Sequence, residues 1–249
     1  MSRPREERFA DLLQRIAAAP LYRRKLAGLP PEAAVLARLR ELPLTTKDEL
    51  RAAGPWGVLA AARRDIARYH ESTGTTGVPA ASWYTREDIE TGARQVLECG
   101  AGLCADDLVL VRFPYALALP AFLIEKAAEL TGAGTIPAGS RNAVTPYPKV
   151  LQLLERLEAT VMAGLPREME LLALTARLEG RPARGRFPAL RALITAGELL
   201  GERRRRHLER LWGVPVYNLY GSTETGNIAA SCEYGALHVT ERDFLVEVL

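Results

Sequence analysis

The residues best suited to chemistry in this sequence form a short loop rich in hydroxyls and glycines. Its six members are Ser72, Thr73, Gly74, Thr75, Thr76 and Gly77. Glycine lets backbone amides approach an anion closely, and the hydroxyls can donate hydrogen bonds to its oxygens, so the loop favours phosphate binding. It is not a Walker A loop, because the G-x-x-x-x-G-K-[ST] spacing is missing and Val78 stands where lysine would follow. An ordinary turn between two elements is the alternative.

Two further clusters stand where strands are expected to end. The second cluster contains Tyr220, Gly221, Ser222, Thr223 and Glu224, at the end of a strand expected over residues 214–219. An aromatic ring, two hydroxyls and a carboxylate suit a nucleotide, with the carboxylate able to hold Mg²⁺ on its phosphates. The third cluster contains Thr195, Ala196, Gly197 and Glu198, after a strand expected over residues 190–195. Either cluster alone could be a loop with a capping carboxylate.

The elements that must position these clusters alternate between strand and helix. Short apolar runs predict strands over residues 108–113, 135–136, 160–163, 190–195 and 214–219. Amphipathic spacing predicts helices between them, over residues 117–130, 147–157, 167–178 and 199–212. This alternation is typical of an α/β domain with mostly parallel strands, whose ligands bind beyond the carboxyl ends of the strands.

The first part of the chain has a different, helical character. Phe9, Leu12, Leu13 and Ile16 share one helix face, and a second helix is expected to start near Thr46. We therefore expect an N-terminal helical segment over residues 1–70, packing on an α/β nucleotide- and acid-binding domain over residues 71–249. Residues 244–249 read as an apolar strand without a turn or a polar tail, which indicates that the domain is incomplete at its C-terminus.

Composition excludes several classes of protein. The 249 residues are 48% apolar and 25% charged, which is typical of a soluble globular protein and excludes disorder and fibrous repeats. Because 33 basic residues face 30 acidic ones, charge gives no argument for nucleic acid, and the arginine run over residues 203–206 is expected to be a solvated face. No run approaches the about 18 apolar residues of a membrane span, and no secretion signal is visible. We expect a cytoplasmic protein that binds neither membrane nor nucleic acid.

The three clusters together, in the order residues 72–79, 196–198 and 220–224 along the chain, resemble the adenylate-forming superfamily of acyl-CoA synthetases, luciferases and peptide-synthetase adenylation domains. Within it the sequence is most similar to the phenylacetate-CoA ligase branch. Supporting stretches are residues 21–25, 42–47, 235–238 and 241–244. The resemblance runs from about residue 10 to Leu249. It implies the N-terminal domain of an adenylate-forming enzyme, lacking the small C-terminal domain.

The resemblance also implies a role for each cluster. Ser72, Thr73, Gly74, Thr75, Thr76 and Gly77 would bind the β- and γ-phosphates of ATP. In the second cluster, Tyr220 would lie against adenine, Thr223 would reach the α-phosphate and Glu224 would bind Mg²⁺. Gly221 and Ser222 would complete this nucleotide-binding segment. Gly197 and Glu198 would line the adenine pocket, although Leu199 stands where this branch often has proline.

The implied reaction is attack of a substrate carboxylate on the α-phosphate of ATP, which releases pyrophosphate and leaves an acyl-adenylate. CoA is the implied acceptor of the acyl group in the complete enzyme. The acid is expected near Phe113, Tyr115, Ala196 and Leu219, an apolar and partly aromatic lining that favours aryl or other apolar acids. No protein nucleophile is required, because such chemistry depends on positioning and on neutralising charge.

The sequence departs from the family pattern in what it lacks. Full-length members continue with a ribose-binding aspartate and a C-terminal domain that carries a catalytic lysine, whereas the last lysine here is Lys149. A chain of this length is expected to bind nucleotide weakly and turn over slowly. The alternative is a catalytically inactive nucleotide- or acid-binding fragment that serves as an interaction module. A separate C-terminal-domain chain is a candidate partner, and a homodimer fits the resemblance.

A zinc site is the weakest of the candidate sites. Cys232 and His238 are six residues apart, and some relatives place a structural zinc near this point with two later cysteines. Two ligands cannot close a four-coordinate zinc site, so ordinary packing is the favoured interpretation.

Overall fold

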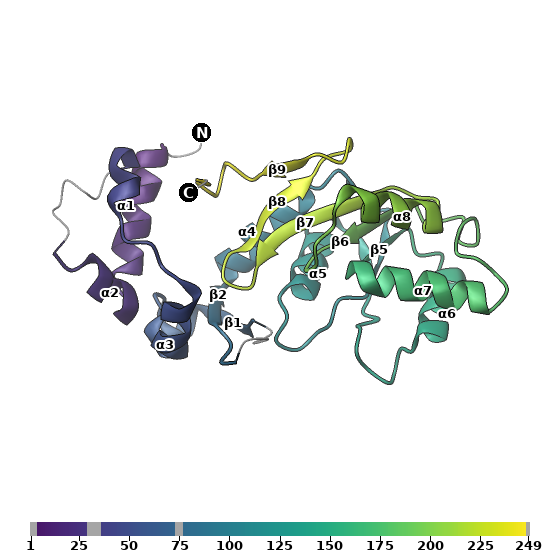
Figure 1. The fold of residues 1–249 in the computed structure, drawn as a ribbon, viewed down its shortest axis with the longest axis horizontal. Helices are drawn as coiled ribbons and strands as arrows, with labels where there is room; N and C mark the ends of the chain where they lie inside the picture. The colour runs from purple at the N-terminus through teal and green to yellow at the C-terminus, as the bar shows by residue number, and fades with distance from the viewer. Residues whose placement is uncertain (1–3, 29–35, 73–76, 248–249) are drawn as a thin grey trace. The chain divides into compact units, whose positions relative to one another are not determined.

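The computed structural model describes residues 4–28, 36–72 and 77–247, and Figure 1 shows their fold. These residues divide into two compact units, residues 1–87 and 88–249. Each unit is described by itself. The sequence-based boundary after residue 70 stays a prediction. No helix among the described residues is long and apolar enough to span a bilayer.

The first unit combines short helices with a two-stranded antiparallel ribbon. Its helices are α1 (Arg5–Ile16), α2 (Pro20–Leu26), η2 (Leu36–Glu41), α3 (Lys47–Gly57) and η3 (Arg63–Asp65). The ribbon pairs β1 (Ile66–Glu71) with β2 (Ala81–Thr85). The helix start expected near Thr46 is confirmed, because Thr46 Oγ1 accepts from the Glu49 amide at 3.2 Å and the Thr46 amide donates to Glu49 Oε2 at 2.7 Å. This reciprocal cap satisfies two backbone groups at the helix end.

The second unit contains a seven-stranded sheet in the order β4-β3-β5-β6-β7-β8-β9. Its strands are β3 (Leu108–Val111), β4 (Gly134–Ile136), β5 (Val161–Gly164), β6 (Ala192–Thr195), β7 (Val216–Ser222), β8 (Gly226–Ser231) and β9 (Leu237–Val239). Strands β3 to β7 are parallel, and β8 and β9 are added antiparallel. The expected α/β class with mostly parallel strands is thereby confirmed.

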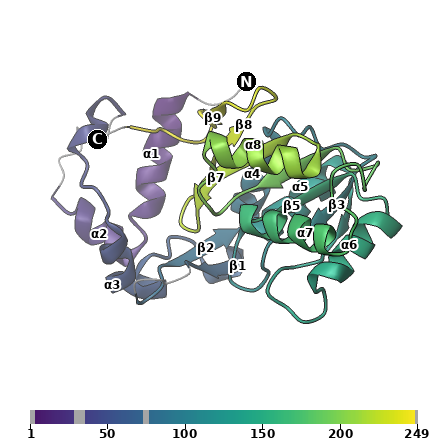
Figure 2. The ribbon, with the colours of Figure 1, turned by 45° about the vertical axis from the view of Figure 1, so that its right-hand side comes forward.

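Helices cover both faces of this sheet. They are α4 (Arg86–Leu97), α5 (Pro120–Thr131), α6 (Tyr147–Arg156), α7 (Pro166–Leu178) and α8 (Glu202–Trp212). Right-handed crossovers place α6, α7 and α8 on one face and α5 on the other, because the connection from β3 to β4 runs opposite to the later ones. Figures 1 and 2 show α6, α7 and α8 together on one side. The core between this side and the sheet includes Leu151, Met169, Leu172, Leu208 and Trp212.

Every strand and helix expected between residues 108 and 219 is present, with ends displaced by a few residues. The strand expected over residues 244–249 is wrong for residues 244–247, which form no strand; Val248 and Leu249 lie outside the described residues. The amides of Asp243 and Phe244 both donate to the Thr240 carbonyl at 3.0 Å, which closes a turn. Apolar character alone was therefore insufficient, because a strand also needs a neighbour with which to pair.

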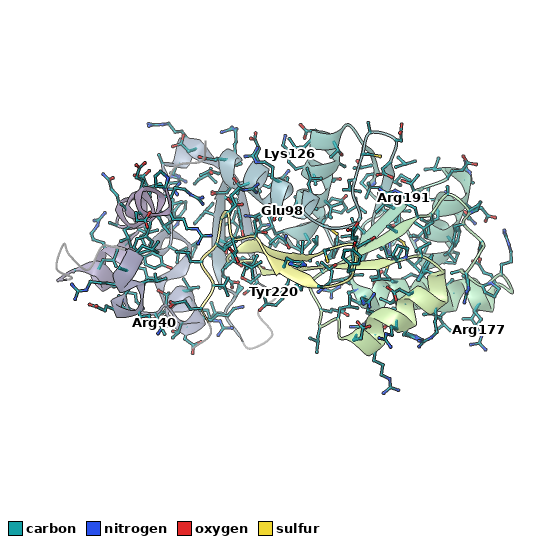
Figure 3. The ribbon with its side chains drawn as sticks, turned by 90° about the horizontal axis from the view of Figure 1, so that it is seen from above. Arg40, Glu98, Lys126, Arg177, Arg191 and Tyr220 are labelled. Atoms are coloured by element: carbon teal, nitrogen blue, oxygen red, sulfur yellow. The ribbon has the colours of Figure 1, made fainter. Side chains whose placement is uncertain are left out.

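An ion pair between Asp107 and Arg191 connects the amino ends of the central strands. The buried carboxylate of Asp107, just before β3, accepts from Arg191 Nε at 2.8 Å and Nη2 at 2.6 Å, and from Thr160 Oγ1 at 2.7 Å. Arg191, labelled in Figure 3, precedes β6, and Thr160 precedes β5. Although burial acts in the opposite direction, hydrogen bonds from Arg191 and Thr160 hold the pKa of Asp107 well below its ordinary value. This end of the sheet lies opposite the carboxyl edge, so the pair serves stability rather than ligand binding.

Replacing Asp107 should lower stability in a pH-dependent way. Because the folded-state pKa is depressed, its contribution is present above the unfolded-state value of about 4 and is lost as pH falls toward the folded-state value. We expect Asp107→Asn to reduce the free energy of unfolding by about 1–3 kcal/mol at pH 7, with the difference shrinking below about pH 4. Urea denaturation at several pH values measures this. Asp106→Asn, at the exposed neighbouring residue, is the control. A loss of unfolding free energy in Asp107→Asn that is equal at pH 7 and pH 3 would contradict the prediction.

Candidate functional site: the carboxyl edge of the sheet

The hairpin between β7 and β8 carries the second sequence cluster. Its turn consists of Thr223, Glu224 and Thr225. The Ser222 amide donates to Thr225 Oγ1 at 3.2 Å, the two hydroxyls lie 3.0 Å apart, and the Glu224 amide donates to Ser222 Oγ at 3.2 Å. The Ser222 hydroxyl holds the turn in shape, and its expected contact with nucleotide stays a prediction. Thr225, a partner that the sequence reasoning missed, lies directly after the motif.

Close backbone contact explains the glycine of this motif. A Cβ added at Gly221 would lie only 1.9 Å from the carbonyl oxygen of Gly226. The two residues sit beside a register shift in the β7–β8 pairing, which brings the strands together at this point. Only glycine fits at position 221, so the packing of the hairpin by itself restricts the residue type at this position of the motif.

Three side chains of this hairpin are exposed or half-buried at the carboxyl edge of the sheet. The ring of Tyr220, labelled in Figure 3, is 58% exposed at the end of β7, which leaves an aromatic face open. Glu224 is half-buried at the turn, and Thr223 beside it is also half-buried. A carboxylate and a hydroxyl are oxygen donors that suit Mg²⁺ and phosphate respectively. The hairpin thus offers the donor set that a magnesium nucleotide requires.

The cluster after β6 lies beside this hairpin, because β6 pairs with β7. Thr195 is the register partner of Asn218, and Thr195 Oγ1 donates to the Tyr217 carbonyl at 3.0 Å. Gly197 has a φ of 79°, in the left-handed region that glycine adopts without strain. Ala196 is buried, as is Leu219 on β7, both at this end of their strands. The structure therefore brings the second and third clusters to one edge.

Glu198 is fixed by helices α7 and α8. Its carboxylate pairs with Arg204 Nη2 at 2.9 Å and accepts from the Arg167 amide at 3.3 Å. Arg204 also makes two hydrogen bonds to Glu170, at 2.8 and 3.0 Å, and these lower the pKa of Glu170. Within the arginine run, Arg204 and Arg205 are half-buried and paired with glutamates, whereas Arg203 and Arg206 are exposed, so the expected solvated face is made by part of the run. Leu199, in contrast, is 88% exposed.

The expected acid-side residues stand at the end of β3, on the same edge of the sheet. Phe113 is fully buried, and its carbonyl accepts from the Ser140 amide at 3.2 Å. The Tyr115 hydroxyl donates to Glu125 Oε1 at 2.7 Å, and its ring packs edge-on against Phe122. Burial and the neighbouring carboxylate raise the pKa of Tyr115, so it stays a neutral phenol at physiological pH.

The hydroxyl- and glycine-rich loop belongs to the first unit. Ser72 is described: its amide donates to the Ala80 carbonyl at 3.0 Å, and its Oγ accepts from the Ala80 amide at 2.9 Å. Gly77 has a φ of 123°. The other four expected phosphate-binding residues lie outside the described residues: Thr73, Gly74, Thr75 and Thr76. Their roles stay predictions.

The candidate zinc ligands stand at the turn between β8 and β9. The Cys232 amide donates to the Ala236 carbonyl at 2.9 Å, and His238 pairs with Ala230 across the strands. Among the described residues, no three His, Cys, Asp or Glu side chains gather closely enough to hold a metal ion. The zinc interpretation therefore gains no support, and Glu224 would need oxygens from the nucleotide itself to complete a magnesium site.

Comparison with known proteins agrees with this geometry. A family described as "AMP-binding enzyme" matches residues 31–244. The chain belongs to the AMP-binding enzyme family. The resemblance stated from the three clusters is thus confirmed, and the matched span covers the hydroxyl- and glycine-rich loop and both clusters of the carboxyl edge.

Relatives within this family are phenylacetate-CoA ligases. That of Escherichia coli is 30% identical over 211 residues, covering 82% of this chain and 47% of the relative. That of Thermus thermophilus is 28% identical over 257 residues, covering 98% of this chain and 56% of the relative. A crystal structure of 2-hydroxyisobutyryl-CoA ligase with 2-HIB-AMP and CoA matches with a TM-score of 0.81 and 26% identity, over 92% of this chain and 51% of that one. The fold is that of an adenylate-forming N-terminal domain, and the chain spans about half the length of the curated relatives it matches.

The hairpin of this AMP-binding family member should not tolerate a side chain at position 221. Because the added methyl group would overlap the Gly226 carbonyl, we expect Gly221→Ala to lower the free energy of unfolding by about 3 kcal/mol. Gly201→Ala is the matched control, since an added Cβ there meets nothing within 4 Å, and it should cost less than about 1 kcal/mol. Chemical denaturation of both variants measures the difference. Equal stabilities would show that the backbones are not in contact at this point.

Proposed function

We propose that this chain activates a carboxylic acid with ATP and Mg²⁺, forming an acyl-adenylate and pyrophosphate. The observation that carries the proposal is the β7–β8 hairpin, which presents Tyr220, Thr223 and Glu224 beside Gly197 and Glu198 at the carboxyl edge of a parallel sheet. This is the edge at which α/β proteins bind their ligands. Membership of the AMP-binding family supports a nucleotide as that ligand.

Each side chain of the edge has a role in this proposal. The exposed ring of Tyr220 stacks on adenine, whose pocket is completed by Gly197 and Glu198. The Thr223 hydroxyl donates to the α-phosphate, and Glu224 binds Mg²⁺, which neutralises charge on the phosphates. The loop that contains Ser72 and Gly77 binds the β- and γ-phosphates. No protein nucleophile takes part, because the substrate carboxylate attacks the α-phosphate directly and the protein orients the two groups.

The acid is proposed to be aryl or otherwise apolar. Phe113, Tyr115, Ala196 and Leu219 are apolar or aromatic and stand at the ends of β3, β6 and β7. The phenylacetate-CoA ligases among the relatives, and a salicylyl-CoA synthase that is 32% identical over 196 residues, are consistent with such an acid. Their names also support CoA as the acceptor of the acyl group in the complete enzyme.

Turnover is proposed to be slow for the chain as given. The relatives are about twice as long as the matched region, and the sequence contains no lysine after Lys149 that could stabilise the transition state. Loss of one such charge typically lowers a rate by about 10²–10³. The same observation favours a second candidate function, a nucleotide- or acid-binding module without catalysis, which a separate C-terminal-domain chain could complete.

Exchange of labelled pyrophosphate into ATP tests the proposal. We expect exchange with at least one acid of a panel containing phenylacetate, benzoate and 2-hydroxyisobutyrate. Glu224→Ala should reduce that exchange by about 10²–10³-fold, because the metal loses its protein ligand. Glu233→Ala, at an exposed glutamate of the β8–β9 turn, is the control and should exchange like the wild type.

The same preparations distinguish the two candidate functions. Isothermal titration with Mg·ATP shows whether nucleotide binds at all. Binding without exchange favours the module, whereas a chain that shows no exchange and binds neither Mg·ATP nor any acid of the panel overturns both candidates.

A further inference from the structure

A buried arginine follows β3 directly, beside the residues expected to line the acid site. The Arg112 side chain is 3% exposed, and its Nε donates to Glu168 Oε2 at 2.9 Å. Its Nη1 donates to three backbone carbonyls, those of Ala138 at 3.0 Å, Gly139 at 2.5 Å and Thr145 at 2.8 Å. The guanidinium therefore connects the end of β3, the start of α7 and the loop that follows β4. We refer to residues 138–145 as the β4–α6 loop.

The acidic partner of this arginine is itself held in place. Glu168 lies in the first turn of α7, and its Oε1 accepts from the Tyr147 hydroxyl at 3.1 Å. The Arg112 guanidinium lies over the Tyr147 ring, 5.2 Å from its centroid. Both charges are thus desolvated and paired, with an aromatic face against the cation.

The β4–α6 loop is held in one conformation by further hydrogen bonds. Asn142 Nδ2 donates to the Gly139 carbonyl at 2.7 Å, and Asn142 Oδ1 accepts from the amides of Val144 and Thr145 at 2.9 and 2.8 Å. Thr145 Oγ1 donates to the Ala138 carbonyl at 2.5 Å. Arg141 takes a φ of 59°, a conformation that a non-glycine residue keeps only when its surroundings impose it.

This loop packs directly against the expected acid-side residues. A Cβ added at Gly139 would lie 3.0 Å from the Tyr115 ring, and the Ser140 amide donates to the Phe113 carbonyl at 3.2 Å. Ser140 is 5% exposed, and its hydroxyl has no hydrogen-bond partner among the residues that the structure describes. Leaving a buried hydroxyl without a partner is unfavourable, and a polar atom of a bound ligand would remove that cost.

Stability alone does not account for a pair of this kind. Burying two charges is expensive, and replacing such a pair by apolar side chains of similar volume is often neutral or stabilising. What apolar side chains cannot supply is a donor for several converging carbonyls. The feature specific to Arg112 is therefore its set of hydrogen bonds to backbone carbonyls of the β4–α6 loop.

We propose that Arg112, with Glu168 as its counter-ion, is a positioning residue that fixes the β4–α6 loop against Phe113 and Tyr115 and so shapes the site of the carboxylic acid. The inference rests on the proposed function. In this proposal Arg112 affects the affinity for the acid through the backbone carbonyls that it binds. It makes no contact with the nucleotide.

A double variant separates this role from a purely structural one. In Arg112→Met/Glu168→Met both charges are removed together, so no unpaired charge stays buried and the chain should fold, whereas Arg112→Met alone leaves Glu168 uncompensated. We expect the double variant to bind acid at least 10-fold more weakly, with Mg·ATP affinity within twofold of the wild type. The acid used is the member of the panel that the wild type binds most tightly in isothermal titration. Thr145→Val, which removes the hydroxyl that donates within the loop and accepts from Arg112 Nη1, should give a smaller loss in the same direction.

Limited proteolysis with trypsin provides a second measurement, which requires no ligand. Arg141 is exposed within the β4–α6 loop, so loosening the loop should accelerate cleavage after Arg141, mapped by mass spectrometry. Arg186→Met/Glu179→Met is the matched control, because Arg186 is 6% exposed and pairs with Glu179 at 2.8 Å without touching this loop. It should change neither acid affinity nor cleavage after Arg141.

The outcomes distinguish failure of this inference from failure of the proposed function. Wild-type acid affinity and wild-type protection of Arg141 in the double variant would overturn the inference and leave the proposed function intact. Parallel losses of acid and ATP affinity would also overturn it, since they would indicate general destabilisation. A wild-type chain that binds neither acid nor ATP would overturn the proposed function and this inference with it.

Discussion

The site in the second unit depends on how closely β7 and β8 approach each other at Gly221. In a parallel sheet, the segments that follow the carboxyl ends of the strands are usually loops. After β7, however, the chain reverses within three residues into β8, and the close approach of Gly221 to the Gly226 carbonyl makes this reversal tight. The turn residues are consequently held at the end of the sheet, next to the residues that follow β6. If the two strands were wider apart, Tyr220 and Glu224 would no longer have defined positions.

The two ends of the sheet use charge differently. At the amino end, Asp107 and Arg191 join segments that precede three strands, and their hydrogen bonds are directed at the protein itself. At the carboxyl end, Arg204 positions Glu198, and Arg112 holds the carbonyls of a loop. Each of these arginines acts on a residue or a segment that would surround a ligand. The Asp107–Arg191 pair thus stabilises the end of the sheet opposite to the edge where a ligand would bind.

Much of this arrangement follows from the sequence, because parallel strands buried on both faces appear as apolar runs and the helices between them as amphipathic ones. Strands β8 and β9 were missed for physical reasons: Gly226–Ser231 is built of small and polar residues, and Leu237–Val239 is only three residues long and exposed. The pairing of Arg204 with Glu170 of α7 could not be identified without the orientation of the helices. Arg112 was missed because its partner, Glu168, is 56 residues away and no local pattern joins them. The motif residues at the carboxyl edge could be proposed from the sequence because their spacing is local.

The hydrogen bonds inside the β7–β8 turn have a consequence for the energetics of recognition. Ser222 and Thr225 already fix the turn through each other and through the Glu224 amide, so its backbone does not have to become ordered when a ligand arrives. The entropy of ordering a flexible segment commonly reduces affinity, and a preorganised turn avoids that loss. A ligand that binds at this turn would therefore meet a backbone that is already ordered.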